Sequence, residues 1–386
     1  MKVVLFSPNP VNVFGGFEKI VKVVSDYLSL KGVDFSICKL ASENEDVPPK
    51  DKWVEPYNKI CNSLLVYECE KGIFQKLRQW SGDFRIVDEK NSKIIKDSDI
   101  AIVISPIFLK VIRQYLRRIG SNAKIVTWFH LPLSYTFLSL KFPKNLIKSS
   151  VFKVFRVYQE QLKHADLHLS ISSGIAAEIK MFSPNANVKI VYNPALCDDY
   201  LNIEPIRRSE KPVFAYVGRL DNSQKNLFFL LKALSKLKFE WKLKVVGTGP
   251  DENKLKMYAK KIGVEKYLEW LGFSSSPFEL LRNEGVSAVL LTSKFEGLPT
   301  VLIEAISYGI PVVSSHCPTG PDDIIINGIN GFLYKPGSIN DFVDKVNYVI
   351  SNSHIFSQSE KIRKTVEKFR TSLVCEAIYR ELSNLT

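Results

Sequence analysis

The sequence predicts an α/β protein of two domains, each a parallel β-sheet covered by helices. Two observations support this prediction. The chain has 386 residues, well above the ~150 residues of a typical single domain. Short apolar runs rich in β-branched residues alternate with stretches of helical periodicity, which is typical of parallel sheets whose strands are connected by helices.

The apolar runs define the elements in order. In the first half we expect strands at residues 3–6, 35–40, 100–105, 124–129 and 167–172. In the second half we expect them at 213–218, 242–247, 286–293, 310–315 and 331–336. Prolines and alternating charges interrupt any periodicity over 194–212, so this segment is the expected linker. We therefore predict an N-terminal domain over 1–205, a second domain over 206–360, and a C-terminal helix over 361–386 that crosses back to the first domain.

Composition excludes several classes of protein. Hydrophobic residues at 45% and charged residues at 24% are ordinary values for a globular protein. An uncharged run over 125–140 has 16 residues, whereas a membrane span needs ~20 apolar residues, so we expect no transmembrane segment. The six cysteines show no zinc-ligand spacing, and the start of the chain is broken by prolines and glycines unlike a signal peptide. We expect a reduced, cytoplasmic protein.

The net charge of +13 predicts an acidic partner. Residues 105–165 hold 11 Lys or Arg and one acid, Glu160. Two interpretations stay open: a core helix with a basic outer face, or a surface around Lys141 and Lys144 that rests on anionic lipid or on a phosphorylated glycolipid. Nucleic acid is disfavoured, because aromatic residues do not alternate with basic ones in any known module.

Two motifs are weak. The stretch VVGTGPDE (245–252) has Gly247 and Gly249 but Glu252 where a dinucleotide fingerprint needs its third glycine, which disfavours a nicotinamide site. Residues 97–99 read Asp-Ser-Asp, a pattern with which some sugar transferases bind a metal ion. They precede a strand, whereas ligands of parallel sheets collect after the strands, so a structural role is favoured.

Two cations follow the predicted strand 213–218. Arg219 and Lys225 lie within a short turn of each other at the expected C-terminal edge of the sheet. A guanidinium matches phosphate oxygens with a planar fork, and an ammonium adds a point charge. The pair predicts a pyrophosphate clamp, with two solvated surface residues as the alternative.

The segment SKFEGLPTVLIEAISYGIPVVSS (293–315) places Glu296 and Glu304 around a helix start at which Pro299 fits the first turn. Three backbone amides there can converge on an anion: those of Gly297, Leu298 and Thr300. Eight helical residues advance ~12 Å, which is too far for a paired glycosidase site and suits the two ends of a nucleotide sugar. The alternative is a capping glutamate followed by a core helix.

Five motifs occur in one order: Gly15-Gly16-Phe17-Glu18 after the first strand, His130 in TWFH, VGRL with Lys225, EWLGF, and Glu296-x7-Glu304. Together they resemble the retaining glycosyltransferases of family 4, over nearly the whole chain. Within that family the chain is most similar to the lipopolysaccharide core galactosyltransferases that form an α-1,6 linkage. The stretches that carry this likeness are 168–175, 240–249, 286–311 and 317–337.

The resemblance implies the GT-B fold, in which two Rossmann-like domains face each other across a cleft. It implies retaining, metal-independent transfer of a hexose, with galactose expected, from a UDP-sugar to a glycan or glycolipid of lipopolysaccharide core or a related surface polysaccharide. No cofactor and no nucleic acid partner are implied, and the expected location is the cytoplasm, including the cytoplasmic face of the inner membrane. The alternatives are a nucleotide-sugar hydrolase or epimerase, or a transferase that uses UDP-glucose or UDP-N-acetylglucosamine.

The resemblance also assigns residues. It implies four at the reaction centre: His130, Arg219, Lys225 and Glu296. It implies donor contacts at eleven more: Gly15, Gly16, Asn193, Gly218, Gly272, Phe273, Gly297, Leu298, Pro299, Thr300 and Glu304. The two cations are implied to neutralise the leaving diphosphate, Glu296 to bind sugar hydroxyls and Glu304 the ribose. For His130, a structural role packed beside Trp128 stays open.

Overall fold

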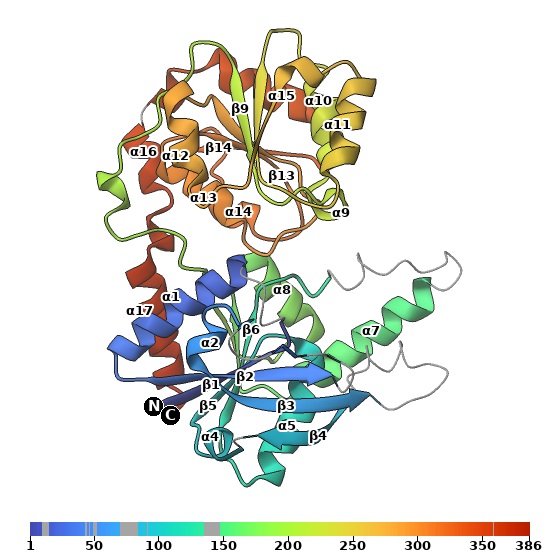
Figure 1. Cartoon of the computed structure of the whole chain (residues 1–386), viewed down its shortest axis with the longest axis vertical. Helices are drawn as coiled ribbons and strands as arrows, with labels where there is room; N and C mark the ends of the chain where they lie inside the picture. Colours follow the sequence, from blue (N-terminus) through green and yellow to red (C-terminus); the bar gives the residue numbers. More distant parts are fainter. Residues whose placement is uncertain are drawn as a thin grey trace. The chain divides into compact units, whose positions relative to one another are not determined.

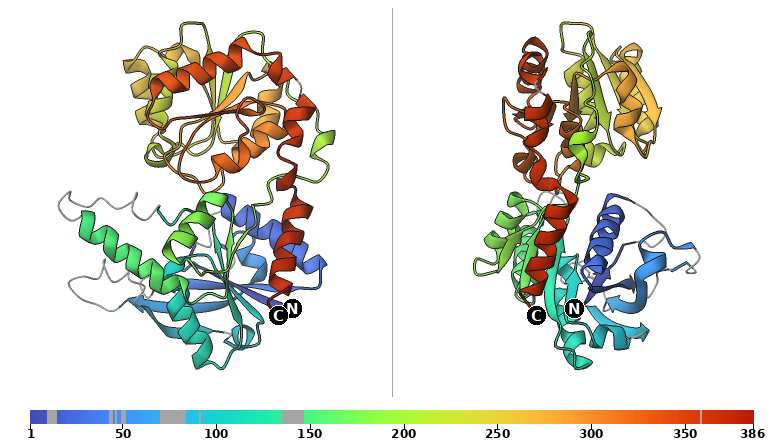
Figure 2. Two further views of the ribbon diagram at one scale, coloured as in Figure 1. Left: turned by 180° about the vertical axis from the view of Figure 1, so that it is seen from behind. Right: turned by 90° about the vertical axis from the view of Figure 1, so that its left-hand side faces the viewer.

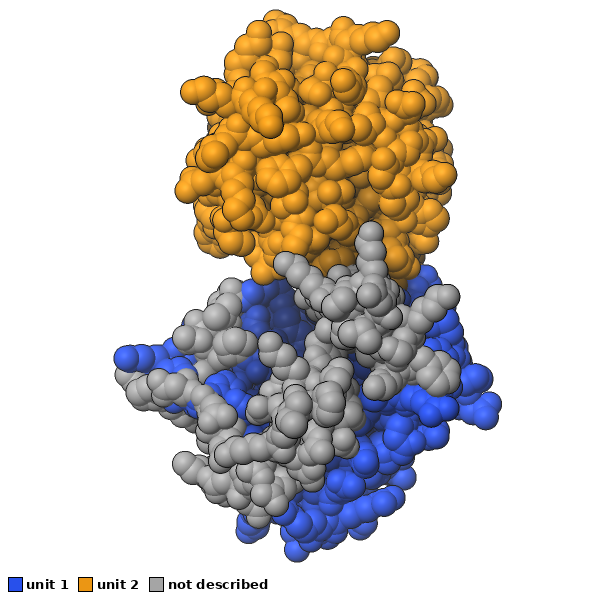
Figure 3. All heavy atoms as spheres, turned by 90° about the vertical axis from the view of Figure 1, so that its right-hand side faces the viewer, with its two compact units in different colours: residues 1–194, 372–386 blue, residues 195–371 orange. Residues whose placement is uncertain are grey.

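The computed structural model describes residues 1–9, 15–42, 45, 47–48, 52–69, 84–90, 92–134, 147–357 and 359–386. The chain forms two compact units, each drawn in its own colour in Figure 3. Unit 1 comprises Met1–Pro194 and Ser372–Thr386, and unit 2 comprises Ala195–Thr371. The domain limits at 205/206 and 360/361 stay predictions.

Unit 1 contains an eight-stranded sheet of order β4-β3-β2-β1-β5-β6-β7-β8. Its strands are β1 (Lys2–Ser7), β2 (Asp34–Ser42), β3 (Cys61–Cys69), β4 (Phe84–Lys90), β5 (Ile100–Val103), β6 (Lys124–Phe129), β7 (Leu167–Ser170) and β8 (Val188–Ile190). All neighbours are parallel except β3 and β4, which are antiparallel. The five predicted strands are confirmed, and β3, β4 and β8 are additional.

Seven helices of the described chain belong wholly or almost wholly to unit 1: α1 (Gly16–Leu30), α2 (Tyr57–Ile60), α4 (Ser92–Lys96), α5 (Leu109–Arg118), α7 (Ile147–Leu162), α8 (Ser173–Phe182) and α17 (Thr371–Ser383). The last of them comes from the far end of the sequence and lies beside α1 in both views of Figure 2. The Tyr27 hydroxyl donates to Glu376 Oε2 at 2.6 Å, and Lys31 Nζ lies 2.8 Å from the same oxygen. These contacts join the C-terminal helix to the first helix.

Unit 2 contains a six-stranded, entirely parallel sheet of order β11-β10-β9-β12-β13-β14. Its strands are β9 (Val213–Val217), β10 (Lys242–Val246), β11 (Leu268–Gly272), β12 (Ala288–Leu291), β13 (Val312–Ser315) and β14 (Gly331–Tyr334). This is the 3-2-1-4-5-6 order of the Rossmann fold, which unit 1 repeats in β3-β2-β1-β5-β6-β7. In such sheets ligands bind beyond the C-terminal ends of the strands, where the order reverses.

Helices lie on both faces of the sheet of unit 2 (Figure 1). They are α9 (Asn222–Lys225), α10 (Leu227–Leu234), α11 (Glu252–Lys261), α12 (Pro277–Leu281), α13 (Thr300–Ser307), α14 (Pro321–Ile324), α15 (Ile339–Ser351) and α16 (Ser359–Lys364). Short 3-10 turns of the described chain lie at Pro106–Phe108, Tyr200–Asn202, Glu265–Tyr267, Arg282–Glu284, Ile355–Ser357 and Glu367–Phe369.

A buried arginine connects α16 to the rest of unit 2. Arg363 is 4% exposed, and its Nε donates to the carbonyl of Ser307, the last residue of α13, at 2.6 Å. Its Nη2 donates to the carbonyl of Tyr200, whose hydroxyl in turn donates to the carbonyl of Arg363. Backbone carbonyls thus satisfy the buried guanidinium and hold the segment around Tyr200 against the end of α13.

The weak motifs receive structural explanations. A Cβ at Gly247 would lie 2.0 Å from the Gly218 carbonyl oxygen, and one at Gly249 would lie 2.6 Å from Leu220 backbone atoms. Both glycines therefore allow two loops to touch, backbone against backbone. In unit 1, Asp99 Oδ2 accepts from the backbone N–H of Lys2 at 2.7 Å, so the Asp-Ser-Asp motif lies at the N-terminal edge of the sheet, as predicted.

Within the described residues, the structure contains no helix with the length and hydropathy needed to cross a membrane.

The core histidine His168 makes the stability of unit 1 sensitive to acid. It is 1% exposed on β7, its Nδ1 lies 2.9 Å from the Thr127 hydroxyl, and burial lowers its pKa to about 4. Below pH 6.5 the His168 imidazole becomes protonated in the unfolded chain but stays neutral in the folded chain. The free energy of unfolding therefore decreases as the pH falls from 6.5 towards 4. At pH 5.5 the loss from this group is about 1 kcal/mol.

We therefore expect His168→Gln, which cannot be protonated, to reduce the fall in free energy of unfolding between pH 7.5 and pH 5.5. Urea unfolding of both proteins at the two pH values measures it. Equal falls in the variant and the parent protein would contradict the assignment.

Candidate functional site

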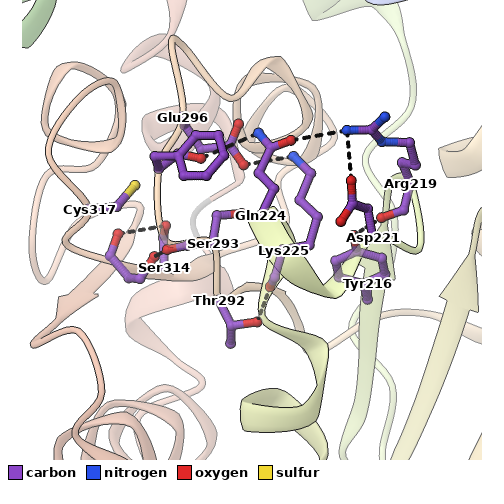
Figure 4. Close-up of polar contacts among 12 residues, drawn as sticks. Tyr216, Arg219, Asp221, Gln224, Lys225, Thr292, Ser293, Glu296, Ser314 and Cys317 are labelled. Atoms are coloured by element: carbon purple, nitrogen blue, oxygen red, sulfur yellow. Dashed lines mark hydrogen bonds and ion pairs between the residues drawn. The ribbon is translucent and has the colours of Figure 1, made fainter. Parts of the chain in front are cut away.

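The predicted cations of unit 2 and the first of its two predicted glutamates, Glu296, lie together at the C-terminal edge of the sheet. The segments after β9 and β12 carry Arg219, Lys225 and Glu296 (Figure 4), and the loop after β13 contacts the segment of Glu296. The strands β9 and β12 are neighbours although far apart in sequence, and the strand order reverses between them. The site therefore lies where a Rossmann sheet opens towards a ligand.

An ion pair joins the first two loops. Lys225 Nζ lies 2.7 Å from Glu296 Oε1, and the side chains are only 17% and 8% exposed. Lys225 is the last residue of the short helix α9, which Asp221 caps by accepting from the Ser223 N–H at 3.0 Å. Asn226 then turns the chain with a left-handed φ of 55°, which asparagine tolerates better than most residues.

The guanidinium of Arg219 lies beside this pair but is exposed. Its Nη2 is 3.1 Å from Asp221 Oδ2 and donates to Gln224 Oε1 at 3.3 Å, while 61% of the side chain remains accessible. The hydrogen bond from Ser223 keeps the pKa of Asp221 below its usual value, so this carboxylate stays charged next to the arginine. The arrangement holds the arginine in place and leaves most of its surface open to an anion.

The backbone that presents Arg219 is anchored from below by Tyr216 of β9. The Tyr216 side chain is fully buried, and its hydroxyl donates to the Arg219 carbonyl at 2.8 Å. Burial raises the pKa of this phenol, which therefore remains a hydrogen-bond donor at neutral pH.

The loop of Glu296 is held by the loop after β13. The Thr319 hydroxyl donates to the backbone carbonyl of Glu296. Gly320 has a φ of 92°, and a Cβ there would lie 2.6 Å from the Gly297 carbonyl oxygen and 2.8 Å from Pro299 Cδ. Only glycine therefore allows the two loops to approach so closely.

The helix start differs slightly from the prediction. α13 begins at Thr300, and Pro299 is the residue before it, with a ψ of 88° outside the helical range. The predicted ~12 Å between the two glutamates assumed eight helical residues. Only Glu304, which is half-buried, lies in the helix, so that separation does not apply to Glu296. Gly297 and Leu298 lie in the loop that leads into the helix.

Three further predicted donor residues follow strands of unit 2. Gly218 directly follows β9 and has a φ of 150°, and Gly272 ends β11 with a φ of 69°. The Gly272 carbonyl accepts from the Gly247 N–H at 2.7 Å. Phe273 is 78% exposed, an unusual accessibility for a large apolar ring at the C-terminal edge of a sheet.

The remaining predicted residues belong to unit 1, where His130 follows β6. Its ring packs edge-on against Trp128 and Phe17, with centroids 4.6 and 4.8 Å away. Burial lowers the pKa of His130 to about 3, so the imidazole is neutral. Its Nε2 is buried and has no hydrogen-bond partner among the residues that the structure describes, and the same holds for Trp128 Nε1.

Gly15 and Gly16 open helix α1. The Gly15 N–H donates to Glu18 Oε2 at 3.0 Å, which closes the first turn. A Cβ at Gly15 would lie 3.2 Å from that carboxylate, whereas one at Gly16 would meet no atom of the described residues within 4 Å. Packing among the described residues therefore disfavours a side chain at Gly15 and does not exclude one at Gly16.

Asn193, after β8, is 3% exposed, and its Oδ1 likewise lacks a partner among the described residues. The structure thus groups the predicted residues into two sets, one in each unit. The set of unit 1 is Gly15, Gly16, His130 and Asn193. The set of unit 2 is Gly218, Arg219, Lys225, Gly272, Phe273, Glu296, Gly297, Leu298, Pro299, Thr300 and Glu304.

Sequence analysis missed the residues that hold these groups in place. In unit 2 they are Tyr216, Asp221 and Thr319. In unit 1, Glu178 of α8 accepts from the N–H and the hydroxyl of Ser134, at 3.3 and 2.5 Å, in the loop that follows His130. Only Asp221 had a sequence signal, since an aspartate two residues before a serine at a helix start is typical of a cap.

No group of three His, Cys, Asp or Glu side chains within the described ranges is arranged to hold a metal ion. The prediction of metal independence stays a prediction.

Comparisons with known proteins agree with this geometry. The family Glycosyl transferases group 1 matches residues 202–369. A lipopolysaccharide 1,6-galactosyltransferase of Salmonella typhimurium is 36% identical over 275 residues, 70% of each chain. The Escherichia coli K12 protein of the same name is 33% identical over 389 residues, covering 98% of this chain and 97% of the relative.

Solved structures give the same result for the fold. The apo form of the lipopolysaccharide outer core galactosyltransferase WaaB matches with a TM-score of 0.77 and 28% identity, over 100% of this chain and 99% of the other. Anabaena Alr3699/HepE, solved with UDP, matches over 100% of both chains with a TM-score of 0.73 at 18% identity, a likeness of fold alone. The predicted α/β fold class, two Rossmann-like parallel-sheet domains of the GT-B type, is confirmed. The chain belongs to the group 1 glycosyltransferases and is an enzyme that transfers a glycosyl group.

Proposed function

We propose that this glycosyltransferase moves a hexose, assigned as galactose, from a UDP-sugar to an acceptor of lipopolysaccharide core. The observation that carries the proposal is the grouping of Arg219, Lys225 and Glu296 at the end of β9 and β12. The names of the relatives from Salmonella and Escherichia coli support galactose and the lipopolysaccharide acceptor.

In this proposal the two cations bind the donor diphosphate. Lys225 has three N–H donors and directs one at Glu296, which leaves two for phosphate oxygens. Arg219 supplies a planar fork from the more exposed side. Both charges stabilise the negative charge that develops on the departing UDP. The second oxygen of Glu296 is available to accept a hydrogen bond from a hydroxyl of the donor sugar.

We further propose that the enzyme belongs to family 4 and retains the anomeric configuration without a metal ion. The acceptor hydroxyl attacks the anomeric carbon on the face from which UDP leaves. The bond between that carbon and the phosphate oxygen breaks as the new glycosidic bond forms, and the hydroxyl proton passes to the β-phosphate. The support is that two protein cations supply the charge stabilisation that a metal ion supplies elsewhere.

Arg219→Ala tests the diphosphate clamp. We expect transfer to fall by about 10²-fold or more, because charge stabilisation of the leaving group is lost. The melting temperature should stay unchanged, since the side chain is 61% exposed. The matched control is Arg380→Ala, an arginine 67% exposed on α17, which should retain full activity. Near-normal turnover by Arg219→Ala would show that the clamp is assigned to the wrong residue.

The donor is tested by thermal shift with a panel of UDP-, GDP- and ADP-sugars. A true donor binds only the folded state and raises the melting temperature, by an amount equivalent to about 2.7 kcal/mol at 100 times its dissociation constant. We expect UDP-galactose to give the largest shift. A larger shift with UDP-glucose or UDP-N-acetylglucosamine would assign that sugar, and not galactose, as the one transferred. A response only to GDP- or ADP-sugars would overturn the UDP assignment.

Release of UDP distinguishes transfer from hydrolysis. We expect the purified enzyme to release UDP slowly from its donor alone and much faster with a lipopolysaccharide core acceptor. A rate independent of every acceptor would instead favour a nucleotide-sugar hydrolase.

We also propose that the basic region of unit 1 contacts an anionic membrane surface at the cytoplasmic face of the inner membrane. Arg117 and Arg118 are exposed at the end of α5, and the region continues to Arg156 and Lys163. Lys141 and Lys144 lie outside the described residues. Each basic residue near such a surface contributes about 1 kcal/mol.

The membrane proposal predicts cosedimentation with vesicles that contain phosphatidylglycerol and not with vesicles of phosphatidylcholine alone. Binding should weaken with added salt, and Arg117→Ala/Arg118→Ala should weaken it further. Binding that is absent or insensitive to salt would disprove this contact.

A further inference from the structure

A fully buried lysine of unit 1 contacts the chain directly after β1, ahead of Gly15 and Gly16. Lys39 is near the end of β2 and has no exposed surface. Its Nζ donates to the backbone carbonyls of Pro8 and Asn9, both at 3.0 Å, and lies 2.8 Å from Glu45 Oε1. An ammonium has three N–H donors, and all three have an acceptor here. A buried charge is tolerated only with such complete pairing, so this contact is specific.

The two carbonyls belong to the connection from β1 to α1. Hydrogen bonds connect Asn9 to Gly15 through Glu18. The Asn9 Nδ2 donates to Glu18 Oε1 at 3.2 Å, and Glu18 Oε2 accepts from the Gly15 N–H at 3.0 Å. Glu18 is itself 6% exposed, and both of its carboxylate oxygens accept hydrogen bonds from within unit 1. The lysine is therefore joined to the Gly15 amide through two side chains.

A second set of contacts, made by the side chain of Ser7, also holds Asn9. The Ser7 hydroxyl accepts from the Asn9 N–H at 3.3 Å and lies 2.8 Å from the Tyr57 hydroxyl. Ser7 and Lys39 are register partners on neighbouring strands, so both hold the chain where β1 ends. The chain is thus held at Pro8 and Asn9, ahead of Gly15 and Gly16, for which the family resemblance implies contacts with the donor.

We propose that Lys39 is a positioning residue of the transfer reaction. By holding the Pro8 and Asn9 carbonyls, it sets the direction in which the Gly15 and Gly16 amides point. The inference rests on the proposed function and on the donor contacts that the family resemblance implies for Gly15 and Gly16. Lys39 itself has no exposed surface and acts only through the loop.

Unit 2 offers a matched control. Lys244 lies in β10, which neighbours the central strand β9 as β2 neighbours β1. Its side chain is 4% exposed, and its Nζ lies 3.7 Å from Glu269 Oε2 on β11. Replacing Lys244 with Met removes a buried lysine from the corresponding strand of the other sheet, at a position within the strand and not at its end.

The test compares Lys39→Met with Lys244→Met, and uses kcat, the UDP dissociation constant and the melting temperature. We expect Lys39→Met to lower kcat by about 10²-fold, the effect of misplacing a reacting group by ~1 Å. The UDP dissociation constant should change by a much smaller factor than kcat, because Arg219 and Lys225 of unit 2 still bind the diphosphate. Lys244→Met should lower the melting temperature without a comparable loss of kcat.

Asn9→Ala decides the question if Lys39→Met does not fold, because it removes only the link from the half-buried Asn9 to Glu18. It should lower kcat in the same manner, with a much smaller effect on the UDP dissociation constant. Wild-type kcat in Asn9→Ala, or losses of kcat in Lys39→Met and Lys244→Met that are equal at equal melting temperature, would overturn the proposal. If the parent enzyme transferred no sugar from any UDP-sugar, the proposed function would fail and not this inference.

Discussion

The ion pair between Lys225 and Glu296 is the interaction on which the site of unit 2 depends. It lies mostly out of solvent, so removing one partner would leave the other buried and uncompensated, a far larger penalty than loss of a surface pair. The surrounding contacts hold the two loops in register: the Thr292 hydroxyl donates to the Lys225 carbonyl at 2.8 Å, and the Lys294 N–H donates to the Gln224 carbonyl at 2.8 Å. These bonds place two loops that are distant in sequence so that one ammonium can serve both the carboxylate and a ligand.

How much of this could be predicted depends on what each pattern reports. Strands buried on both faces appear as continuous apolar runs, and every predicted run is a strand. The edge strands β4 and β8 lack that signal, because FRIVDEK is largely charged and VKI has only three residues. Within the site, Lys225 and Glu296 could be predicted because each is a charged residue that follows a strand, where ligands of parallel sheets bind. Thr319 and Lys39 did not, since a hydrogen bond from a side chain to a distant backbone carbonyl leaves no periodic pattern in the sequence.

The glycines separate the demands of the fold from those of a ligand. Gly247, Gly249 and Gly320 are required by the chain itself, because a Cβ would collide with backbone atoms of a neighbouring loop. A Cβ at Gly16 would meet no atom of the described residues within 4 Å, so packing among these residues does not require this glycine. In the proposed function, the missing Cβ allows the donor to approach the amide closely. The same comparison removes the nicotinamide interpretation of VVGTG, whose glycines are fully used by loop packing.

In both units a side chain donates hydrogen bonds to backbone carbonyls of a segment that carries, or leads to, predicted site residues. Tyr216 and Thr319 do so in unit 2, and Lys39 does so in unit 1. A carbonyl that accepts from below fixes the peptide plane, and the N–H groups of the loop then point elsewhere. An anionic nucleotide sugar is bound by N–H groups and cations. In this arrangement the carbonyls of the loop accept hydrogen bonds from the supporting side chains, which leaves the N–H groups of the loop for the ligand. Lys39 gives a firm support of this kind, because its ammonium holds two successive carbonyls, those of Pro8 and Asn9, at once.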